Sequence, residues 1–383
     1  MEKNMQNLED INKRIADRHD VFYWQAERRI SEEEAASIFK DRHTAIKNDE
    51  LIKIVNKSLV DDKCVAIDDF DPEKASFGNV NSCRVGHLES GKDVIIRCHP
   101  KGVKNGYFFV ESLGAEMCLQ NGLPSYHTYA IHQSENENDP AFQVIDKMPG
   151  ITIDDYLKLH PEKENELVYK TGQLMAKVHQ IEGIEGYGSF DNELAKQGIL
   201  KGIYDSFYDS IVAGLDFDLK TLVTYKIISQ DVAEKFRNLF SQDNPLLVCD
   251  KVVFVHNDFA DWNLMTDGEN ITGIIDLDEC VAGDPIRDIA CWSTFFKKER
   301  SKIFWEGYFS IAEKPNNFEE RFQLLRLRYN IMKMCLRVRR YTYSKGDIYK
   351  NKIERGKGDL KVDAEYFGIK YTNPSEENIK INN

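Results

Sequence analysis

A histidine, two aspartates and an asparagine lie close together in the second half of the chain, at a spacing that suits phosphoryl transfer. His256, Asp258 and Asn263 follow a short apolar run, and Asp276 follows a second, β-prone run 18 residues beyond Asp258. A carboxylate can accept the proton of an attacking hydroxyl group, and amide and carboxylate oxygens are ligands that Mg²⁺ prefers. The pattern therefore predicts Asp258 as a general base, with Asn263 and Asp276 as Mg²⁺ ligands.

Three sequence blocks in this region resemble those of a known family of small-molecule kinases. They are His256-x-Asp258-x-x-x-x-Asn263, the Ile275-Asp276 element, and Gly283-Asp284-Pro285 followed by Arg287-Asp288. Their order and spacing are similar to those of the aminoglycoside phosphotransferase and choline kinase family, and most similar to its hygromycin phosphotransferase branch. This family shares its catalytic logic with the protein kinases.

The resemblance implies a two-lobed, protein-kinase-like α+β fold. Residues 61–146 are expected to form a nucleotide-binding N-lobe with a small antiparallel sheet. Residues 147–350 are expected to form a mainly helical C-lobe for catalysis and substrate binding. The helical spacing of apolar residues predicts a helical N-terminal extension over residues 1–60. Residues 351–383 are rich in lysine, glutamate and asparagine, and are predicted to form a loosely ordered polar tail.

Several neighbouring residues are predicted to support the catalytic loop. His256 is expected to orient the loop through hydrogen bonds rather than to transfer protons. The resemblance assigns Asp288 as the helix aspartate that fastens this loop. Asp284 precedes Pro285 and is predicted to cap a helix. Three further acids beside the site are candidates for contacting substrate or a second metal ion: Asp261, Asp278 and Glu279.

The resemblance also assigns phosphate-binding residues in the N-lobe. Arg97 occupies the strand position where most kinases carry a phosphate-gripping lysine, and a guanidinium can contact two phosphate oxygens at once. Glu111 is expected to pair with Arg97, and Glu116 is the alternative. The loop around Gly78 and Asn79 is expected to offer backbone N–H groups to the phosphates, although an ordinary hairpin loop fits the pattern equally well.

The stretch after the N-lobe strands resembles the hinge between two kinase lobes. Backbone groups near Asp146 and Met148 are expected to bind the nucleotide base. Backbone recognition leaves little trace in a sequence, so the predicted donor is either ATP or GTP.

The acceptor substrate is predicted from charge. The net charge is −13, and acidic residues are interspersed through residues 191–250, a stretch that in the resembling family helps to form the acceptor site. These acids either bind ammonium groups of a cationic acceptor or form the solvated faces of helices. We therefore expect a small-molecule hydroxyl acceptor, first of all an aminoglycoside-type antibiotic, which would make the protein a resistance kinase.

The composition argues against several other classes of protein. The acidic balance disfavours nucleic acid as the main partner, and no apolar segment is long enough to cross a membrane. The eight scattered cysteines include no Cys-x-x-Cys pair, and the N-terminus has no signal-peptide pattern, so we expect a cytoplasmic protein. Nothing in the sequence indicates the oligomeric state.

Two alternative functions remain open. The first is a metabolic kinase for an amino alcohol, a sugar or a homoserine-like compound. The second is a non-catalytic, nucleotide-binding regulatory protein with a kinase-like fold. The complete set of Asp258, Asn263 and Asp276 favours catalysis over the second alternative.

Overall fold

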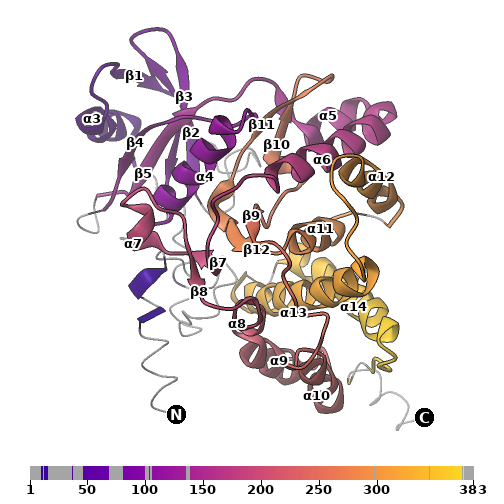
Figure 1. The fold of residues 1–383 in the computed structure, drawn as a ribbon. Helices are drawn as coiled ribbons and strands as arrows, with labels where there is room; N and C mark the ends of the chain where they lie inside the picture. Colours follow the sequence, from indigo (N-terminus) through magenta and orange to yellow (C-terminus); the bar gives the residue numbers. More distant parts are fainter. Residues whose placement is uncertain are drawn as a thin grey trace.

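A β-rich lobe stands beside a mainly helical lobe in the computed structural model (Figure 1). The structure describes residues 10–11, 13–15, 37, 46–68, 81–99, 103, 106–134, 139–296, 298–344, 346–372 and 374. Gly78, Asn79 and most of the predicted N-terminal extension lie outside the described residues. Within the extension, Ile11 and Ile15 are buried against Ile203 of the helical lobe.

A five-stranded antiparallel sheet forms the β-rich lobe, in the order β1-β2-β3-β5-β4. Its strands are β1 (Cys64–Ile67), β2 (Ser82–Leu88), β3 (Asp93–Cys98), β4 (Thr128–His132) and β5 (Phe142–Asp146). Successive side chains of a strand point to opposite faces. Val144 accordingly packs with Leu51 and Val55 of α3 (Asn48–Ser58), whereas Ile145 packs with α4 (Phe108–Gln120) and the core of the other lobe.

Helices build most of the second lobe, around a core that includes Trp292, Phe254, Phe304 and Phe318. The larger helices are α5 (Ile153–Leu159), α6 (Glu164–Val178), α11 (Pro285–Ser293), α12 (Lys298–Phe309), α13 (Phe318–Ser344) and α14 (Asp347–Tyr366). An insertion between α6 and β9 carries α7 (Asn192–Ala195), α8 (Phe207–Val212), α9 (Leu215–Thr224) and α10 (Gln230–Leu239). Short 3-10 turns are η2 (Pro161–Lys163), η3 (Asp261–Asn263) and η4 (Leu277–Glu279).

Two small antiparallel sheets carry the predicted catalytic segments. One has the order β11-β10-β6, with β6 (Ile151–Thr152), β10 (Leu264–Thr266) and β11 (Ile271–Ile274). The other has the order β8-β7-β12-β9, with β7 (Tyr187–Phe190), β8 (Gly202–Tyr204), β9 (Val253–Val255) and β12 (Val281–Gly283). Strand β9 leads into His256, and β11 leads into Asp276, so the two sheets set the positions of both catalytic segments.

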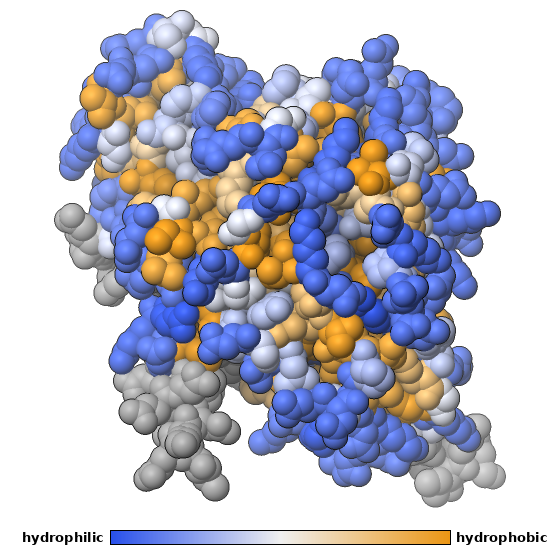
Figure 2. Space-filling view, viewed as in Figure 1, coloured by the Kyte–Doolittle hydropathy of each residue, from blue (hydrophilic) through white to orange (hydrophobic). Residues whose placement is uncertain are grey.

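The fold class agrees with the sequence-based expectation, and Figure 2 shows one face of the molecule. Hydrophobic residues gather at the centre of the face in Figure 2, between the two lobes, and hydrophilic residues surround them. The α+β, kinase-like fold class is confirmed by the antiparallel N-terminal sheet and the helical C-terminal lobe. None of the helices in the described ranges has the length and apolar composition that a membrane span requires.

The prediction of a loosely ordered tail over residues 351–383 is wrong for its first part. Residues Asp347–Tyr366 form the helix α14, which packs along α13. Ile353, Leu360 and Ala364 are buried at helical spacing. The carboxylate of Asp363, also buried, accepts a hydrogen bond from Asn330 over 2.7 Å and pairs with Arg326. A few apolar residues at the right spacing suffice for docking, even in a segment that is polar on average.

Candidate active site

The catalytic loop begins where the buried strand β9 ends. Asn257 has a left-handed backbone conformation (φ 65°), which asparagine tolerates better than most residues. Beyond it, the Nδ2 group of Asn263 donates to both the backbone oxygen and Oδ2 of Asp258, each over 2.8 Å. This pair of hydrogen bonds fixes the Asp258 carboxylate, while Oδ1 has no donor among the described residues.

Asp276 enters the same site from the β10–β11 hairpin. Its backbone is also left-handed (φ 62°), a conformation that costs a non-glycine residue roughly 1–2 kcal/mol. The turn places Oδ1 of Asp276 2.7 Å from Nη2 of Arg97. The negative charge of Asp276 also contributes to raising the pKa of Asp258, so the two acids interact. The structure therefore brings together Asp258, Asn263 and Asp276.

Arg97 joins the β-rich lobe to this site. Its Nη1 group pairs with the carboxylate of Glu111 on α4, and both side chains are buried. The hydroxyl of Tyr126 donates to Oε1 of Glu111 over 2.6 Å. Glu116, the alternative partner, instead accepts a hydrogen bond from Gln120 on the surface of the helix. The partner of Arg97 is therefore Glu111, and the role of this pair toward phosphates stays a prediction.

Burial and charge both act on the proposed base. The pKa of Asp258 is raised well above its ordinary value, first because burial disfavours the carboxylate and then because Glu279 and Asp276 repel it. Lys333 and the hydrogen bond from Asn263 oppose this shift in the pKa of Asp258. A carboxylate with a raised pKa is a stronger base than an ordinary aspartate, as proton abstraction from a hydroxyl requires.

His256 has the contacts of an orienting residue. Its Nε2 lies 3.1 Å from the backbone oxygen of Ile275, and its Nδ1 accepts a hydrogen bond from the backbone N–H of Asp258 over 3.3 Å. Burial lowers the pKa of His256, which favours the neutral ring. A neutral imidazole that donates through Nε2 and accepts through Nδ1 satisfies both contacts. His256 thereby connects the catalytic loop to the segment that carries Asp276.

Asp288, at the start of α11, fastens the other side of the loop. Its two carboxylate oxygens accept the backbone N–H groups of His256 and Asn257, each over 2.9 Å. Nε2 of His179 lies 3.2 Å from the same carboxylate, and Nδ1 of His179 lies 2.8 Å from the hydroxyl of Tyr308. Burial alone would raise the pKa of Asp288, but the hydrogen bond and charge of His179 hold it below its ordinary value.

Asp284 is placed as a helix cap. Asp284 occupies the capping position of α11, and Pro285 is the first residue of the helix. Oδ1 of Asp284 accepts the backbone N–H of Ile286 over 2.8 Å. Its other oxygen pairs with Arg321 of α13. Burial raises the pKa of Asp284 to about 6, although Arg321 opposes the shift. Asp284 therefore joins α11 to α13 and lies outside the catalytic set.

The remaining acids beside the site differ from one another. Asp261 is buried, and its Oδ2 accepts from Nη2 of Arg300 over 2.6 Å, so its charge is already balanced. Asp278 is buried in η4, and Glu279 follows it. Glu279 is close enough to Asp258 to raise the pKa of that base. Substrate contacts by Asp278 and Glu279 stay a prediction.

The expected hinge residues have strong contacts of their own. The backbone N–H of Asp146 donates to the backbone oxygen of His127 over 3.1 Å. The Asp146 side chain accepts the backbone N–H of His127 over 2.8 Å and pairs with Lys92. Met148 packs over Gly273, where a Cβ atom would lie 2.9 Å from its terminal methyl group. The backbone N–H of Asp146 is thus already used, and any contact of this segment with a nucleotide base stays a prediction.

Residues with no role predicted from the sequence complete the surroundings of the base. Nε of Arg287 donates to Oδ1 of Asn257 over 3.2 Å, and Sγ of Cys291 donates to the backbone oxygen of Asn257 over 2.8 Å. On α13, Tyr329 and Lys333 lie four residues apart, and both interact electrostatically with Asp258. The four-residue spacing in both helices is the signal that would have indicated one polar face toward the loop.

A magnesium ion fits the oxygen atoms that this site offers. Oδ1 of Asn263 and Oδ2 of Asp276 have no hydrogen-bond partner among the described residues, because the opposite atoms make the contacts to Asp258 and Arg97. Mg²⁺ typically binds through one or two carboxylates, together with phosphates and water. Within the described ranges no cluster of three or more histidine, cysteine or acidic ligands is found, so a structural metal centre of that kind is not indicated there.

A family model covers the part of the chain that holds the candidate site. The model of the "phosphotransferase enzyme family" matches residues 116–321, more than half of the chain. No curated protein matches the sequence. The matched range contains Asp258, Asn263, Asp276 and Asp288.

Solved structures show the same fold at low sequence identity. A thermostable mutant of aminoglycoside phosphotransferase APH(4)-Ia is 18% identical and has a TM-score of 0.57, covering 82% of this chain and 98% of its own. The same enzyme, in a ternary complex with AMP-PNP and hygromycin B, is 17% identical with a TM-score of 0.56, covering 78% and 94%. A putative fructosamine-3-kinase from Thermobifida fusca is 12% identical with a TM-score of 0.56, covering 82% and 99%. The match to the family model, taken with this shared fold, shows that the chain belongs to the phosphotransferase enzyme family.

Proposed function

We propose that this protein transfers the γ-phosphoryl group of a nucleoside triphosphate to a hydroxyl group of a small molecule, with Mg²⁺ as cofactor. The observation that carries the proposal is the meeting of Asp258, Asn263 and Asp276 around one point, with Arg97 beside them. A base, two oxygen ligands and a phosphate-binding cation are the parts that such a reaction requires.

Each of these residues has a definite task in the proposed reaction. Oδ1 of Asp258 accepts the proton of the attacking hydroxyl, and Asn263 keeps the carboxylate oriented through Oδ2. Arg97 is held by Glu111 and donates toward the phosphates from the strand β3. Asn263 and Asp276 would hold the Mg²⁺ ion, which neutralises the charge of the phosphate oxygens when bound.

The donor is proposed to be ATP or GTP. The AMP-PNP complex of APH(4)-Ia supports an adenine nucleotide as the first donor to test. The eight cysteines of the chain are all free thiols, which supports action in a reducing, cytoplasmic compartment.

The acidic residues of the insertion do not by themselves identify the class of acceptor. Asp216 pairs with Arg237, and Asp218 pairs with Arg328 over 3.0 Å. Asp209 interacts with Ser206 at the start of α8. These contacts use three of the acids that the sequence offered as ammonium-binding groups. An aminoglycoside-type acceptor is therefore supported only by the hygromycin B complex of the related fold, and a metabolic acceptor stands beside it.

The test is a transfer assay with purified protein, MgATP or MgGTP, and a panel of aminoglycosides, amino alcohols, sugars and hydroxy acids. We expect turnover with at least one acceptor and a fall of at least about 100-fold in kcat for Asp258→Asn, as for removal of a general base. Asp231→Asn is the matched control, since Asp231 is an exposed aspartate on α10. Nucleotide binding without transfer to any acceptor would instead support the regulatory alternative.

A further inference from the structure

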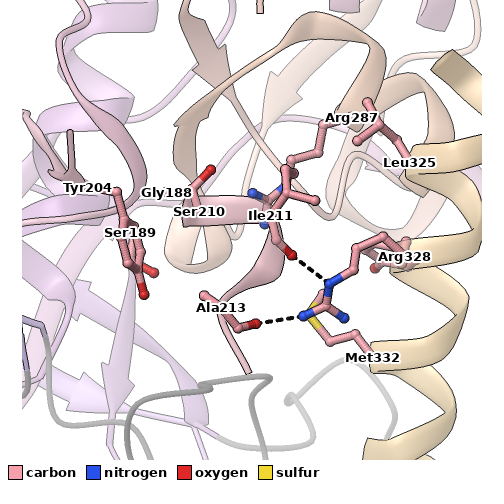
Figure 3. Close-up of a pocket in the computed structure, with 11 residues that line it drawn as sticks. Gly188, Ser189, Tyr204, Ser210, Ile211, Ala213, Arg287, Leu325, Arg328 and Met332 are labelled. Atoms are coloured by element: carbon pink, nitrogen blue, oxygen red, sulfur yellow. Dashed lines mark hydrogen bonds between the residues drawn. The ribbon is translucent and has the colours of Figure 1, made fainter. Parts of the chain in front are cut away.

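A pocket of about 70 Å³ lies between the insertion and α13, next to the catalytic loop (Figure 3). This volume is several times the ~10–15 Å³ that a single water requires, so the pocket has room for a small chemical group. Its walls come from β7, β8 and α8 on one side and from α13 on the other. The lining residues that matter here are Ser189, Ser210, Ile211, Arg287, Arg328 and Tyr329.

Arg287 presents an incompletely paired guanidinium to this pocket. The side chain extends from α11 toward Ser210 and Ile211 (Figure 3). Its Nε donates to Oδ1 of Asn257 over 3.2 Å. In the part of the chain that the structure describes, the two Nη groups have no hydrogen-bond partner, and no carboxylate lies within 4 Å of them. The two Nη groups carry four N–H donors, and Arg287 is one of the residues that line the pocket.

Arg328 adds a second cation to the same walls. Its Nε and Nη2 donate to the backbone oxygens of Ile211 and Ala213, each over 2.6 Å, and its Nη1 pairs with Asp218. Asp218 pairs with Arg328, and Asp288 is the carboxylate whose charge acts on Arg287. Burial and the nearby Arg328 both lower the pKa of Arg287, as expected where cations are held together out of water.

The pocket adjoins the proposed base. Arg287 contacts the side chain of Asn257, and the Cα atoms of consecutive residues such as Asn257 and Asp258 are about 3.8 Å apart. Tyr329 lines the pocket and interacts electrostatically with both Asp258 and Glu279. A small acceptor that occupies the pocket would thus have its remaining atoms near the catalytic loop.

We propose that this pocket binds an acidic group of the acceptor, a carboxylate or a phosphate, through the Nη groups of Arg287. This inference rests on the proposed function and specifies its substrate as a hydroxylated acid. A guanidinium donates to two oxygens of a carboxylate or phosphate at once, so the pocket supplies both charge and orientation. Arg328 is held by Asp218 and two backbone oxygens, and it shapes the wall and adds to the positive potential.

The test compares matched acceptors that differ only in the acidic group. The pairs are glycerate and glycerol, gluconate and sorbitol, and homoserine and homoserine amide, each assayed with MgATP for kcat/KM. We expect the acid of at least one pair to be preferred by roughly 10-fold or more, which is the scale of a hydrogen bond to a charged group. Aminoglycosides are included as cationic acceptors.

Three variants locate the preference in the pocket. Arg287→Gln removes the charge, and we expect it to reduce the ratio of kcat/KM for the acid to that for its neutral partner by roughly 10- to 100-fold. The ratio is the readout, because loss of the contact to Asn257 affects both acceptors. Ser210→Asp places a carboxylate opposite Arg287 and should reduce the ratio as well, whereas the neutral control Ser210→Asn should not.

The outcomes separate this inference from the proposed function. Transfer only to neutral or cationic acceptors, or an acid preference that is unchanged in both Arg287→Gln and Ser210→Asp, overturns the assignment of the pocket but leaves the phosphotransferase intact. Absence of transfer to every acceptor overturns both. Circular dichroism of each variant shows whether it is folded, and Ser210→Asp provides the test if Arg287→Gln is not.

Discussion

Nη2 of Arg97 donates to Oδ1 of Asp276 over 2.7 Å, although 179 residues separate the two in sequence. The other end of the Arg97 guanidinium pairs with Glu111 of α4. One side chain therefore links the sheet of the β-rich lobe, its helix and the proposed metal-binding segment. The planar fork of a guanidinium allows both contacts at once.

The first prediction concerns this link. Arg97→Lys keeps the charge but replaces a fork with a single ammonium group, which cannot reproduce both contacts in the same geometry. We expect the KM for the nucleotide to rise by roughly 10-fold, equivalent to about 1.4 kcal/mol. The measurement is a nucleotide titration at saturating acceptor. Arg14→Lys is a suitable control, because Arg14 pairs with Asp10 and Asp191 and with none of the predicted catalytic residues. An unchanged KM would contradict the role of the fork.

The second prediction is that the proposed base costs stability. Because the pKa of Asp258 is raised in the folded protein, the ionised carboxylate destabilises the fold at any pH above that pKa. Asp258→Asn should therefore raise Tm at neutral pH by ~2 °C or more, given about 1.4 kcal/mol for each unit of pKa. The penalty disappears as the pH falls through the folded-state pKa of Asp258, so the gain in Tm should shrink in acid. A lower Tm for the variant at pH 7 would count against this environment for Asp258.

The third prediction concerns the pH dependence of activity. Asp258 must be deprotonated to act as a base, so kcat/KM should fall in acid through a pKa above the ordinary value of aspartate. Glu279 contributes to raising the pKa of Asp258. Glu279→Gln removes this repulsion and should shift the acid limb of the profile to lower pH. Glu279→Asp retains the charge and serves as the control. An acid limb in the same place for Glu279→Gln would show that another group controls it.

The fourth prediction concerns the fastening of the catalytic loop. Asp288→Asn places an amide where two backbone N–H groups require acceptors. We expect the free energy of unfolding to fall by about 3 kcal/mol, the upper end for hydrogen bonds to a charged group. The pKa of Asp288 is lowered in the fold, so its contribution is present above the unfolded-state pKa and is lost as the pH falls through the folded-state pKa. Urea unfolding at pH 7 and in acid measures both effects. Equal stability of the two proteins at pH 7 would refute the prediction.

Contacts between residues that are close along the chain were predicted from the sequence better than contacts that form only through folding. The spacing of Asp258, Asn263 and Asp276 reflects a fixed loop and hairpin, so their meeting followed from the motif. The pairing of Arg97 with Glu111 followed from the family resemblance, because no local pattern links a strand to the next helix. Arg287 was part of a motif but had no predicted role, and Tyr329 was not predicted, since they come from two helices whose packing is decided by the whole core.

Charge patterns were the least informative part of the sequence. The acids of the insertion suggested a cationic acceptor, but Asp218 pairs with an arginine 110 residues further along the chain. Such partners cannot be recognised without the fold, because the pairing depends on α9 packing against α13. Most of helix α14 lies in the segment predicted as a loosely ordered tail for a similar reason, since its apolar residues are sparse and gain their effect only by docking.

The last prediction concerns two glycines that let α6 and α12 approach closely. A Cβ atom on Gly172 would lie 2.2 Å from the backbone oxygen of Phe304, and one on Gly307 would lie 2.1 Å from that of Tyr169. The close approach brings His179, which follows α6, to the hydroxyl of Tyr308 on α12. Gly172→Ala should therefore lower the free energy of unfolding in urea by about 1–3 kcal/mol, the range for overpacking, and should lower kcat by displacing the support of Asp288. Gly358→Ala in α14 is the control, because no atom lies within 4 Å of the added methyl group and alanine favours the helix by about 1 kcal/mol. A stabilising Gly172→Ala would show that the two helices can separate without loss.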